Sequence, residues 1–373
     1  MRFAPRPAEI LLQALVLGAV VGVLLFFLHT ARERMAAQGI PFSFAFLAQE
    51  AGFSLSEGLT YAPGEGLRPY TPSDTYWQAF LAGFLNTLRV AVAGLVLATL
   101  LGFAIGAARL SRNPLARGLG FLYVELVRNT PLLLQLFVWY FAVLLKLPPV
   151  EGALRFLGIW LSQRGLFLPW IEATPKAYGF LLLLLGTALA VWGLRRYLWA
   201  KVLLPLVLLA GLLFLWPPFN FLLPERTAFG VRGGLEVSPE FTALLFGLTV
   251  YTAAFIAEVV RGALLSIPRG QWEAARALGL DERTVLRVVI LPQAVRIALP
   301  PLINQYLNLT KNSSLAVAVA YPDLFSVYNT IANQSGRALE GVLIVMAVYL
   351  SISLGISALV NAYNRRVILR WGV

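Results

Sequence analysis

Long apolar blocks recur along this chain of 373 residues, and segments rich in charge, proline and glycine separate them. A helix of roughly 20 residues crosses about 30 Å of hydrocarbon, whereas the strands of a membrane barrel would alternate in short segments. The blocks therefore predict an all-α polytopic membrane protein with about eight transmembrane helices. The expected spans are residues 10–28, 79–108, 130–146, 177–193, 202–216, 239–262, 293–319 and 341–362.

The composition agrees with a membrane protein. Hydrophobic residues make up 59% of the chain and charged residues 13%, against about 45–50% and 25% in soluble domains. The first block is longer than a signal-peptide core and no clean cleavage site follows it, so we interpret it as an anchor. The chain has no cysteine and one histidine, His29, which excludes disulfides and leaves no pattern for a metal site.

The formal net charge of +12 would suggest nucleic acid as a partner of a soluble protein. In a membrane protein, cationic loops instead hold cytoplasmic ends against anionic lipid, so we expect membrane lipid and not nucleic acid as the partner. Lys and Arg concentrate in alternate loops if the amino terminus is cytoplasmic. With eight spans, both termini are then expected in the cytoplasm, although Arg32 and Arg34 lie on the wrong side.

The spans and loops divide the chain into four expected segments. Residues 1–78 form an anchor helix and an external loop, and residues 79–146 the first part of a core of membrane spans. Residues 147–238 add an inserted helix pair with external loops. Residues 239–373 complete the core and contain a charged segment at 268–292.

This charged segment, "PRGQWEAARALGLDERTVLRVVILP", contains the start and end signals of two short helices joined by a turn. Pro268 suits a first helical position and Gly279 a position just past the helix end. Trp272, Ala275 and Leu278 form a small apolar face, opposite Arg269, Glu273 and Arg276. Asp281 can cap a second helix, 282–290, that ends before Pro292. The segment either rests on lipid as an amphipathic helix or docks a protein, which the small alanines favour.

The same segment resembles the EAA loop of bacterial ATP-binding-cassette importer permeases. The matching positions are Glu273, Ala274, Ala275, Gly279, Val289, Leu291 and Pro292, with Val289 where that family usually has Ile. In that family the loop forms a coupling helix that inserts into a cleft of the ATPase subunit. The resemblance therefore implies a coupling surface made of Pro268, Arg269, Gln271, Trp272, Glu273, Ala274, Ala275, Gly279, Leu291 and Pro292.

Further stretches, such as "YVELVRNTPLLLQLFVWYF" and "LTKNSSLAVAVAYPDLF", resemble the polar-amino-acid branch of these type I permeases. The long form is similar to general L-amino-acid and glutamate/glutamine/aspartate/asparagine permeases. The resemblance implies an inner-membrane permease subunit that imports L-amino acids. Its implied partners are two ATPase subunits, a second permease copy or homologue, and a periplasmic or lipid-anchored amino-acid-binding protein. It implies no cofactor in this chain, because ATP and Mg would lie on the ATPase.

Other function classes fit the sequence less well. No lysine follows a glycine, so the chain lacks the phosphate-binding loop of an ATPase. Nothing indicates a membrane enzyme, since no His/Asp/Glu cluster or carboxylate pair is evident. A secondary, ion-coupled transporter is the main alternative, because broken spans with buried polar residues are typical of that class. Whether uptake follows ATP or an ion gradient would discriminate the two.

The seventh expected span carries a polar face. Asn304, Asn308 and Lys311 recur at helical spacing, and Asn312, Ser313 and Ser314 follow. In hydrocarbon such a face turns toward the bundle interior or water, so it either lines a substrate pathway or only joins spans through hydrogen bonds. An acidic partner for Lys311 would be Glu258, Asp323 or the substrate. Arg89 either binds a substrate carboxylate or snorkels outward.

Two internal ion pairs are also expected. Glu125 and Arg128, and likewise Glu258 and Arg261, are three residues apart in the echoing stretches "YVELVRN" and "FIAEVVRG". Residues at this spacing are neighbours on a helix surface. Each pair would neutralise itself near a face of the membrane.

Overall fold

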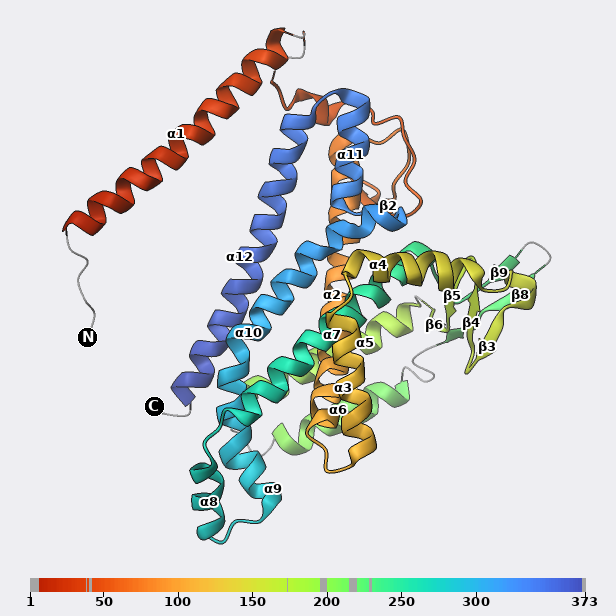
Figure 1. Cartoon of the computed structure of the whole chain (residues 1–373). Coiled ribbons are helices and arrows are strands. Elements are labelled where there is room, and N and C mark those ends of the chain that lie inside the picture. The colour runs from red at the N-terminus through yellow and green to blue at the C-terminus, as the bar shows by residue number, and fades with distance from the viewer. Residues whose placement is uncertain are drawn as a thin grey trace. The chain divides into compact units, whose positions relative to one another are not determined.

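The computed structural model describes residues 7–37, 39, 42–172, 174–194, 200–214, 220–227 and 230–370. Helices dominate these residues (Figure 1). They are α1 (Pro7–Ala37), α2 (Tyr76–Arg109), α3 (Pro114–Arg128), α4 (Leu132–Phe137), α5 (Pro175–Leu194), α6 (Ala200–Phe214), α7 (Pro239–Leu265), α8 (Arg269–Ala277), α9 (Glu282–Thr284), α10 (Leu291–Asn312), α11 (Leu324–Ser335) and α12 (Ala338–Arg370).

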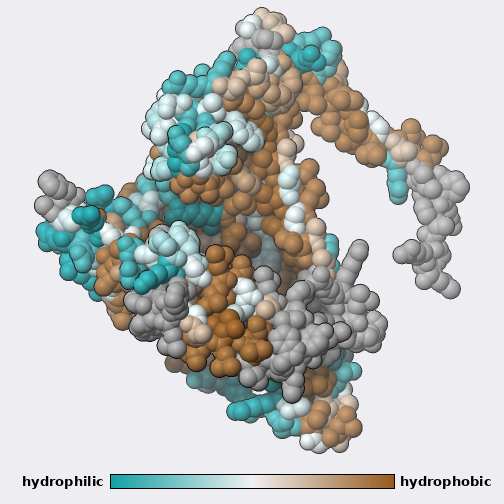
Figure 2. Space-filling view, turned by 180° about the vertical axis from the view of Figure 1, so that it is seen from behind, coloured by the Kyte–Doolittle hydropathy of each residue, from teal (hydrophilic) through white to brown (hydrophobic). Residues whose placement is uncertain are grey.

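Five described helices are long and apolar enough to cross a membrane. They are Leu11–Arg34, Tyr76–Arg109, Pro239–Leu265, Glu282–Val319 and Ala338–Ala362, and they confirm the first, second, sixth, seventh and eighth predicted spans. Hydrophobic side chains cover much of the helical surface (brown in Figure 2). The predicted span 177–193 falls on α5, which has 20 residues. The predicted span 202–216 falls on α6, which has 15 residues, short of roughly 20, and positions 215 and 216 of this span lie outside the described residues.

The third predicted span, 130–146, falls on the helical stretch Leu132–Lys146, but the prediction missed a helix that precedes it. The structure places a helix at Pro114–Arg128, within the stretch we expected to be a loop, and a second helical stretch at Leu132–Lys146, bent from the first by 104°. Pro131 explains the break, because it lacks an N–H and disfavours helical geometry at the residue before it. Counted as one broken span, the two stretches raise the number of candidate spans in the described chain to six.

The loops contain short strands that the hydrophobic pattern did not predict. Two hairpins are β1 (Leu59–Ala62) with β2 (Gly66–Pro69), and β8 (Glu225–Thr227) with β9 (Gly230–Arg232). A third antiparallel pair joins β6 (Trp170–Ile171) to β7 (Phe221–Leu222). A four-stranded antiparallel sheet has the order β10–β5–β4–β3. Its strands are β3 (Leu154–Phe156), β4 (Ile159–Ser162), β5 (Gly165–Leu168) and β10 (Leu235–Val237).

The chain divides into two compact units. Unit 1 comprises residues 1–132 and 248–373, and unit 2 comprises residues 133–247. Unit 2 therefore contains the whole inserted segment 147–238, all of α4 except its first residue, and the start of α7. The coupling segment and the polar seventh span both belong to unit 1.

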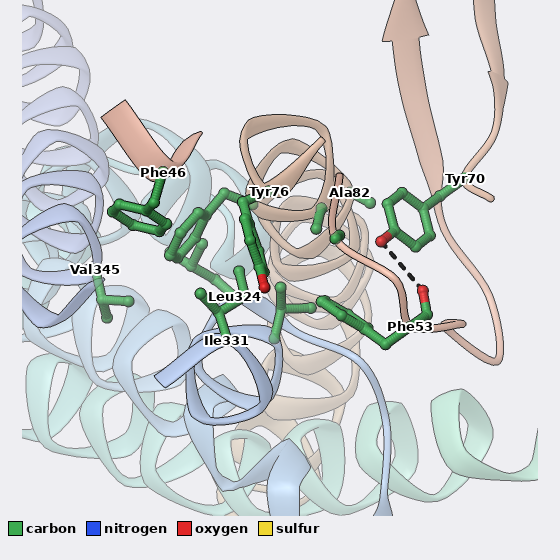
Figure 3. Packing of buried hydrophobic residues seen from close by; sticks show 12 residues of the cluster. Phe46, Phe53, Tyr70, Tyr76, Ala82, Leu324, Ile331 and Val345 are labelled. Carbon is green, nitrogen blue, oxygen red and sulfur yellow. Dashed lines mark hydrogen bonds between the residues drawn. The ribbon is translucent and has the colours of Figure 1, made fainter. Parts of the chain in front are cut away.

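An aromatic core in unit 1 fixes the loop before α2 onto the helices (Figure 3). Phe46, Phe53 and Tyr76 pack with Leu324 and Ile331 of α11, and all are at most 8% exposed. The Tyr70 hydroxyl donates to the Phe53 carbonyl at 3.2 Å, so this buried hydroxyl is satisfied. Burial raises the pKa of Tyr70 to about 12, which keeps it a neutral donor.

Glycines allow α2 and α7 to approach closely. A Cβ on Gly102 would lie 2.6 Å from Ile256 Cβ, and one on Gly106 would lie 3.0 Å from Val260 Cβ. Small residues at such a contact are typical of membrane helix pairs. Ala254 and Ala257 of α7 are completely buried beside Val124 of α3, which closes the packing of these three helices.

This contact predicts that Gly102→Ala destabilises the protein. The added methyl would clash with Ile256, and such overpacking costs about 1–3 kcal/mol. Gly262→Ala in α7 is the matched control, because nothing lies within 4 Å of its Cβ position and helical Gly→Ala is favourable. Thermal unfolding in detergent should show a lower Tm for Gly102→Ala alone. Equal Tm values for the two variants would contradict the close approach.

Candidate functional site

The coupling segment forms a helix that ends on a glycine turn. Helix α8 begins at Arg269, so Pro268 is its N-cap rather than its first residue. Gly279 has a φ of +78°, as expected for a left-handed residue past a helix end. Its N–H donates to the Arg276 carbonyl at 2.9 Å, and the Leu280 N–H donates to the Ala275 carbonyl at 3.4 Å. These two bonds satisfy carbonyls that the helix end would leave free.

The second half of the segment departs from the prediction. Asp281 caps the next helix as expected, and its side chain accepts from the N–H groups of Arg283 and Thr284. A hydrogen bond from the Thr284 hydroxyl holds the pKa of Asp281 below its ordinary value. The helix does not end before Pro292, however, but continues from Glu282 to Val319. A π-helical turn at Val285–Ile290 widens the backbone just before Pro292, where a normal turn would clash with the proline ring.

A small apolar cluster locks α8 onto these neighbours. We call residues 268–294 the platform. The buried cluster joins Ala275, Val285, Ile290 and Ala294 of the platform to Ile267, which directly precedes it, and each of these residues is at most 5% exposed. Trp272, Leu280 and Val289 pack around it while partly exposed. Since Ile267 follows α7 and Ala294 lies in α10, the cluster ties α8 to two helices of span length.

The opposite side of α8 is open. Gln271 and Glu273 are exposed, as are Ala274 and Ala277. Leu278 is 80% exposed, whereas Trp272 is half-buried and Ala275 is buried, so the predicted apolar face is divided between the interior and the surface. The Gly279 turn carries the backbone away after Ala277 and leaves Leu278 outside.

Most of the predicted coupling residues lie on the platform surface. Arg269, Gly279 and Leu291 are exposed, Pro292 is half-buried, and Ala275 is buried. Polar contacts brace the turn: Arg276 Nη2 lies 2.7 Å from Glu282 Oε1, and Gln293 Nε2 donates to Gln271 Oε1 at 3.3 Å. The exposed pair of Arg276 and Glu282 contributes only about 0–1 kcal/mol to stability. The buried cluster therefore contributes most to holding α8 in place.

An ion-pair cluster sits where α2 and α7 meet. Arg261 Nη2 lies 3.0 Å from Glu258 Oε2, as the spacing of these residues predicts. Glu258 also pairs with Arg109 of α2, whose side chain is 9% exposed. The sequence analysis missed this second partner, because 149 positions separate the two residues and no local pattern joins them.

The other expected pair takes a different arrangement. Glu125 accepts from Asn129 Nδ2 at 3.2 Å, and the Arg128 guanidinium lies over the Phe255 ring at 5.1 Å. Among the described residues, Glu125 and Arg128 do not form an ion pair with each other. Arg128 gains a cation–π contact instead.

The polar face of α10 is outward in the single chain. Asn304, Asn308 and Lys311 are all exposed. In the described chain neither expected acid reaches Lys311: Glu258 is held by arginines, and Asp323 caps α11 and accepts from the Tyr349 hydroxyl at 3.3 Å.

The residues that follow Lys311 behave differently. The hydroxyls of Ser313 and Ser314 donate to the carbonyls of Thr310 and Lys311 at 2.7 and 2.8 Å. Ser313 is buried, whereas Asn312 and Ser314 are half-buried. Both serine hydroxyls are therefore hydrogen-bonded within their own helix. Asn304, Asn308 and Lys311 remain as the exposed polar side chains of this face.

Arg89 has a carboxylate partner. Its Nη1 lies 2.7 Å from Glu57 Oε2, in the loop before β1, and its side chain is 40% exposed. A substrate carboxylate at Arg89 would have to share this guanidinium with Glu57.

An apolar groove of about 400 Å³ lies between α2, α7 and α10. Thr99 and Tyr306 supply its hydroxyls and bond each other at 3.1 Å, so it offers nothing to a zwitterion. Among the described residues, no group of three or more Asp, Glu or His side chains could hold a metal ion.

Comparison with known proteins identifies relatives of this chain. Residues 94–369 match the family described as the binding-protein-dependent transport system inner membrane component. The general L-amino acid transport system permease protein AapQ of Rhizobium johnstonii is 40% identical over 98% of this chain and 94% of its own length. The glutamate/glutamine/aspartate/asparagine transport system permease protein BztB of Rhodobacter capsulatus is 38% identical over 98% of this chain and 95% of its own.

A crystal structure of an amino acid ABC transporter with histidines aligns with a TM-score of 0.49 at 22% identity, over 78% of this chain and 95% of the other. The family match covers well over half of the chain, and the two relatives match it almost from end to end. This chain therefore belongs to the family of binding-protein-dependent transport system inner membrane components.

Proposed function

We propose that this chain is the membrane-spanning permease subunit of an ATP-driven importer of L-amino acids. Two nearly full-length relatives carry names of amino-acid permeases, and the family is one of binding-protein-dependent transport. The observation that carries the proposal is the platform: an exposed helix locked by a buried cluster onto α7 and α10. Such a helix can receive force from a partner and pass it to the spans.

The platform docks the ATPase subunit through the open side of α8. Small side chains at Gly270, Ala274 and Ala277 allow a close approach, and Leu278 supplies an exposed apolar contact. Apolar anchors in a polar surround are typical of protein interfaces. Two ATPase subunits would serve two permease subunits, and ATP and Mg would bind on them rather than on this chain.

The open polar face of α10 supports the expected second permease subunit. Asn304, Asn308 and Lys311 are exposed in one chain but are too polar to face lipid. A second copy or homologue would enclose them, and the enclosed space would be the substrate pathway. A periplasmic or lipid-anchored amino-acid-binding protein would deliver the substrate from the other side of the membrane.

Function as an importer requires a bacterial inner-membrane orientation with the platform in the cytoplasm. The loop Leu110–Asn113 and the platform should share that side, together with both termini, whose outermost residues lie outside the described part. The loops that hold Ser56 and Gln163 should face the periplasm.

The deciding experiment for the function measures uptake by the purified complex in proteoliposomes. We expect L-amino-acid uptake to require ATP on the side of the membrane where the ATPase subunits bind the platform. It should also require the binding protein on the opposite side. Uptake that persists without ATP and follows an ion gradient would instead make the chain part of a secondary transporter.

Gly279→Asp should uncouple hydrolysis from uptake. Nothing lies within 4 Å of the Cβ position of Gly279, so the new side chain would project into the partner rather than into this chain. The left-handed φ adds strain, and the carboxylate adds charge at a packed joint. Proteoliposome uptake should fall severalfold. Gly64→Asp is the matched control, since Gly64 also has a positive φ and open space. Equal uptake by the two variants would disprove coupling through this turn.

The orientation predicts the labelling of single cysteines, because the natural chain has none. Ser56→Cys and Gln163→Cys, both at exposed positions, should react with an impermeant maleimide in intact cells. Arg112→Cys, equally exposed, should react only after permeabilisation. Labelling of Arg112→Cys in intact cells would show that the chain has the opposite orientation in the membrane. Ser162 is unsuitable for this test because it is fully buried.

Lys311→Met should lower transport while leaving the complex assembled. A fixed cation on the pathway offsets the desolvation of a substrate carboxylate, since charges interact more strongly in a low dielectric. We expect a severalfold loss of uptake that is greater for anionic than for cationic amino acids, and recovery in Lys311→Arg. Loss of assembly in Lys311→Met would make the residue structural, and normal uptake of every substrate would remove it from the pathway.

A further inference from the structure

The four-stranded sheet of unit 2 has two unlike faces. Directly opposed residues of antiparallel strands lie on the same face, so the observed register assigns every side chain to a face. One face, which we call the apolar sheet face, consists of Leu154, Phe156, Ile159, Leu161, Leu166, Leu168, Leu235 and Val237. The other face carries Arg155, Trp160, Ser162, Gly165, Phe167 and Glu236.

The more apolar face is the less covered one. On the mixed face, Trp160 and Phe167 are 8% and 2% exposed, and Arg155 stacks on the Trp160 ring at 4.0 Å. On the apolar sheet face, Leu154 and Phe156 of β3 are 53% and 69% exposed, whereas the residues of β4, β5 and β10 on that face are half-buried, apart from the buried Val237. A sheet in water turns its apolar face to the core. Strand β3 is also an edge strand, and its one charged side chain, Arg155, lies on the other face, over Trp160. Something apolar must therefore meet this face.

The turn between β3 and β4 points to the same surroundings. Leu157 and Gly158 form its two central positions, with φ values of +50° and +80°. Asn-Gly suits such a turn, whereas a leucine with positive φ is strained. Leu157 is 82% exposed, so packing within the described chain does not offset that strain. Its side chain is placed for a contact outside the unit.

The same hairpin tip lies against the segment that leads into α5. A Cβ on Gly158 would lie 3.2 Å from Pro169 Cγ and 3.9 Å from Leu223 Cδ2. Strand β6 follows Pro169 directly, and its pairing with β7 continues where the Glu172 N–H donates to the Asn220 carbonyl at 2.8 Å. Thr174 then caps α5, because its Oγ1 accepts from the Ala177 N–H at 3.2 Å.

Aromatic side chains surround this junction. Trp170, Phe221 and Tyr178 are 52%, 65% and 58% exposed, the last in the first turn of α5. Trp and Tyr concentrate where a membrane meets water. Only residues 172–174 separate β6 from α5, a reach of at most about 10 Å. The layer of headgroups is about 5–7 Å thick on each side of the hydrocarbon, so β6 lies within this layer or directly next to it if α5 enters the bilayer.

We propose that the apolar sheet face and the Phe156–Leu157 tip rest in the interfacial layer of the bilayer beside α5. The partner is the boundary between lipid headgroups and acyl chains. A docked protein fits the chemistry less well, because interfaces are enriched in Tyr, Trp and Arg with a polar rim, and the apolar sheet face has no polar side chain. The inserted segment thus braces unit 2 on lipid.

The test places an environment-sensitive fluorophore on a single cysteine at Leu157→Cys. Gln163→Cys is the matched control, since Gln163 is an exposed turn residue at the other end of the same strand, β4. The full complex is reconstituted in nanodiscs of phosphatidylcholine and phosphatidylglycerol, with and without lipids that carry a nitroxide near the acyl carbonyl. We expect blue-shifted emission and severalfold quenching at position 157, and water-like, unquenched emission at 163.

Three results would overturn the proposal or support it. Equal, water-like emission at both positions would overturn it. Shielding of position 157 that appears only after the amino-acid-binding protein is added would also overturn it, and would make the face a protein docking site. In detergent, Leu157→Asn should keep or raise the Tm, because asparagine suits the turn; a lower Tm would show that Leu157 serves the fold and not the bilayer.

Discussion

The packing of Ala275 onto the helix that follows it is the constraint on which the platform depends. Ala275 is 4% exposed among Ile267, Val285 and Ile290, where a larger side chain would lift α8 away. Because the cluster includes the end of the α7 segment and Ala294 of α10, α8 cannot move without these helices. Interiors packed at this density transmit displacement rather than absorb it. A displacement applied to the exposed side of α8 would therefore be transmitted to α7 and α10.

A second constraint comes from the bilayer, which offers no hydrogen bonds to polar groups. Ser313 and Ser314 meet it by bonding to carbonyls of their own helix, and Glu258 meets it by holding Arg109 and Arg261. The polar groups of Asn304, Asn308 and Lys311 are not satisfied in this way. Their exposure in one chain is consistent with a membrane complex of more than one subunit, in which a neighbour or water completes them.

Local physics made part of this structure predictable from the sequence. Gly279 at a helix end and Asp281 at a helix start follow from rules that act within a few residues, and five apolar blocks became helices of span length. The errors arose where contacts between residues distant in sequence, or small departures from regular helix geometry, determine the structure. The Arg109–Glu258 pair depends on the packing of α2 on α7. The continuous helix through Pro292 depends on a π-helical turn, and Leu278 is exposed because the chain reverses beside it.

The strands of the insertion were missed for a related reason. A half-buried strand is recognised by alternation of apolar and polar residues over about 4–8 positions, but β3 has only three residues, and in β4 Trp160 places an apolar ring on the face opposite Ile159 and Leu161. Such a sequence resembles a buried segment, yet its strands are too short and too exposed to form a core of their own. The pattern becomes consistent if both faces meet apolar surroundings, one inside unit 2 and one in lipid. A sheet whose fully apolar face includes its most exposed hydrophobic side chains is then an adaptation to the membrane surface, just as a uniformly apolar helix is to the membrane interior.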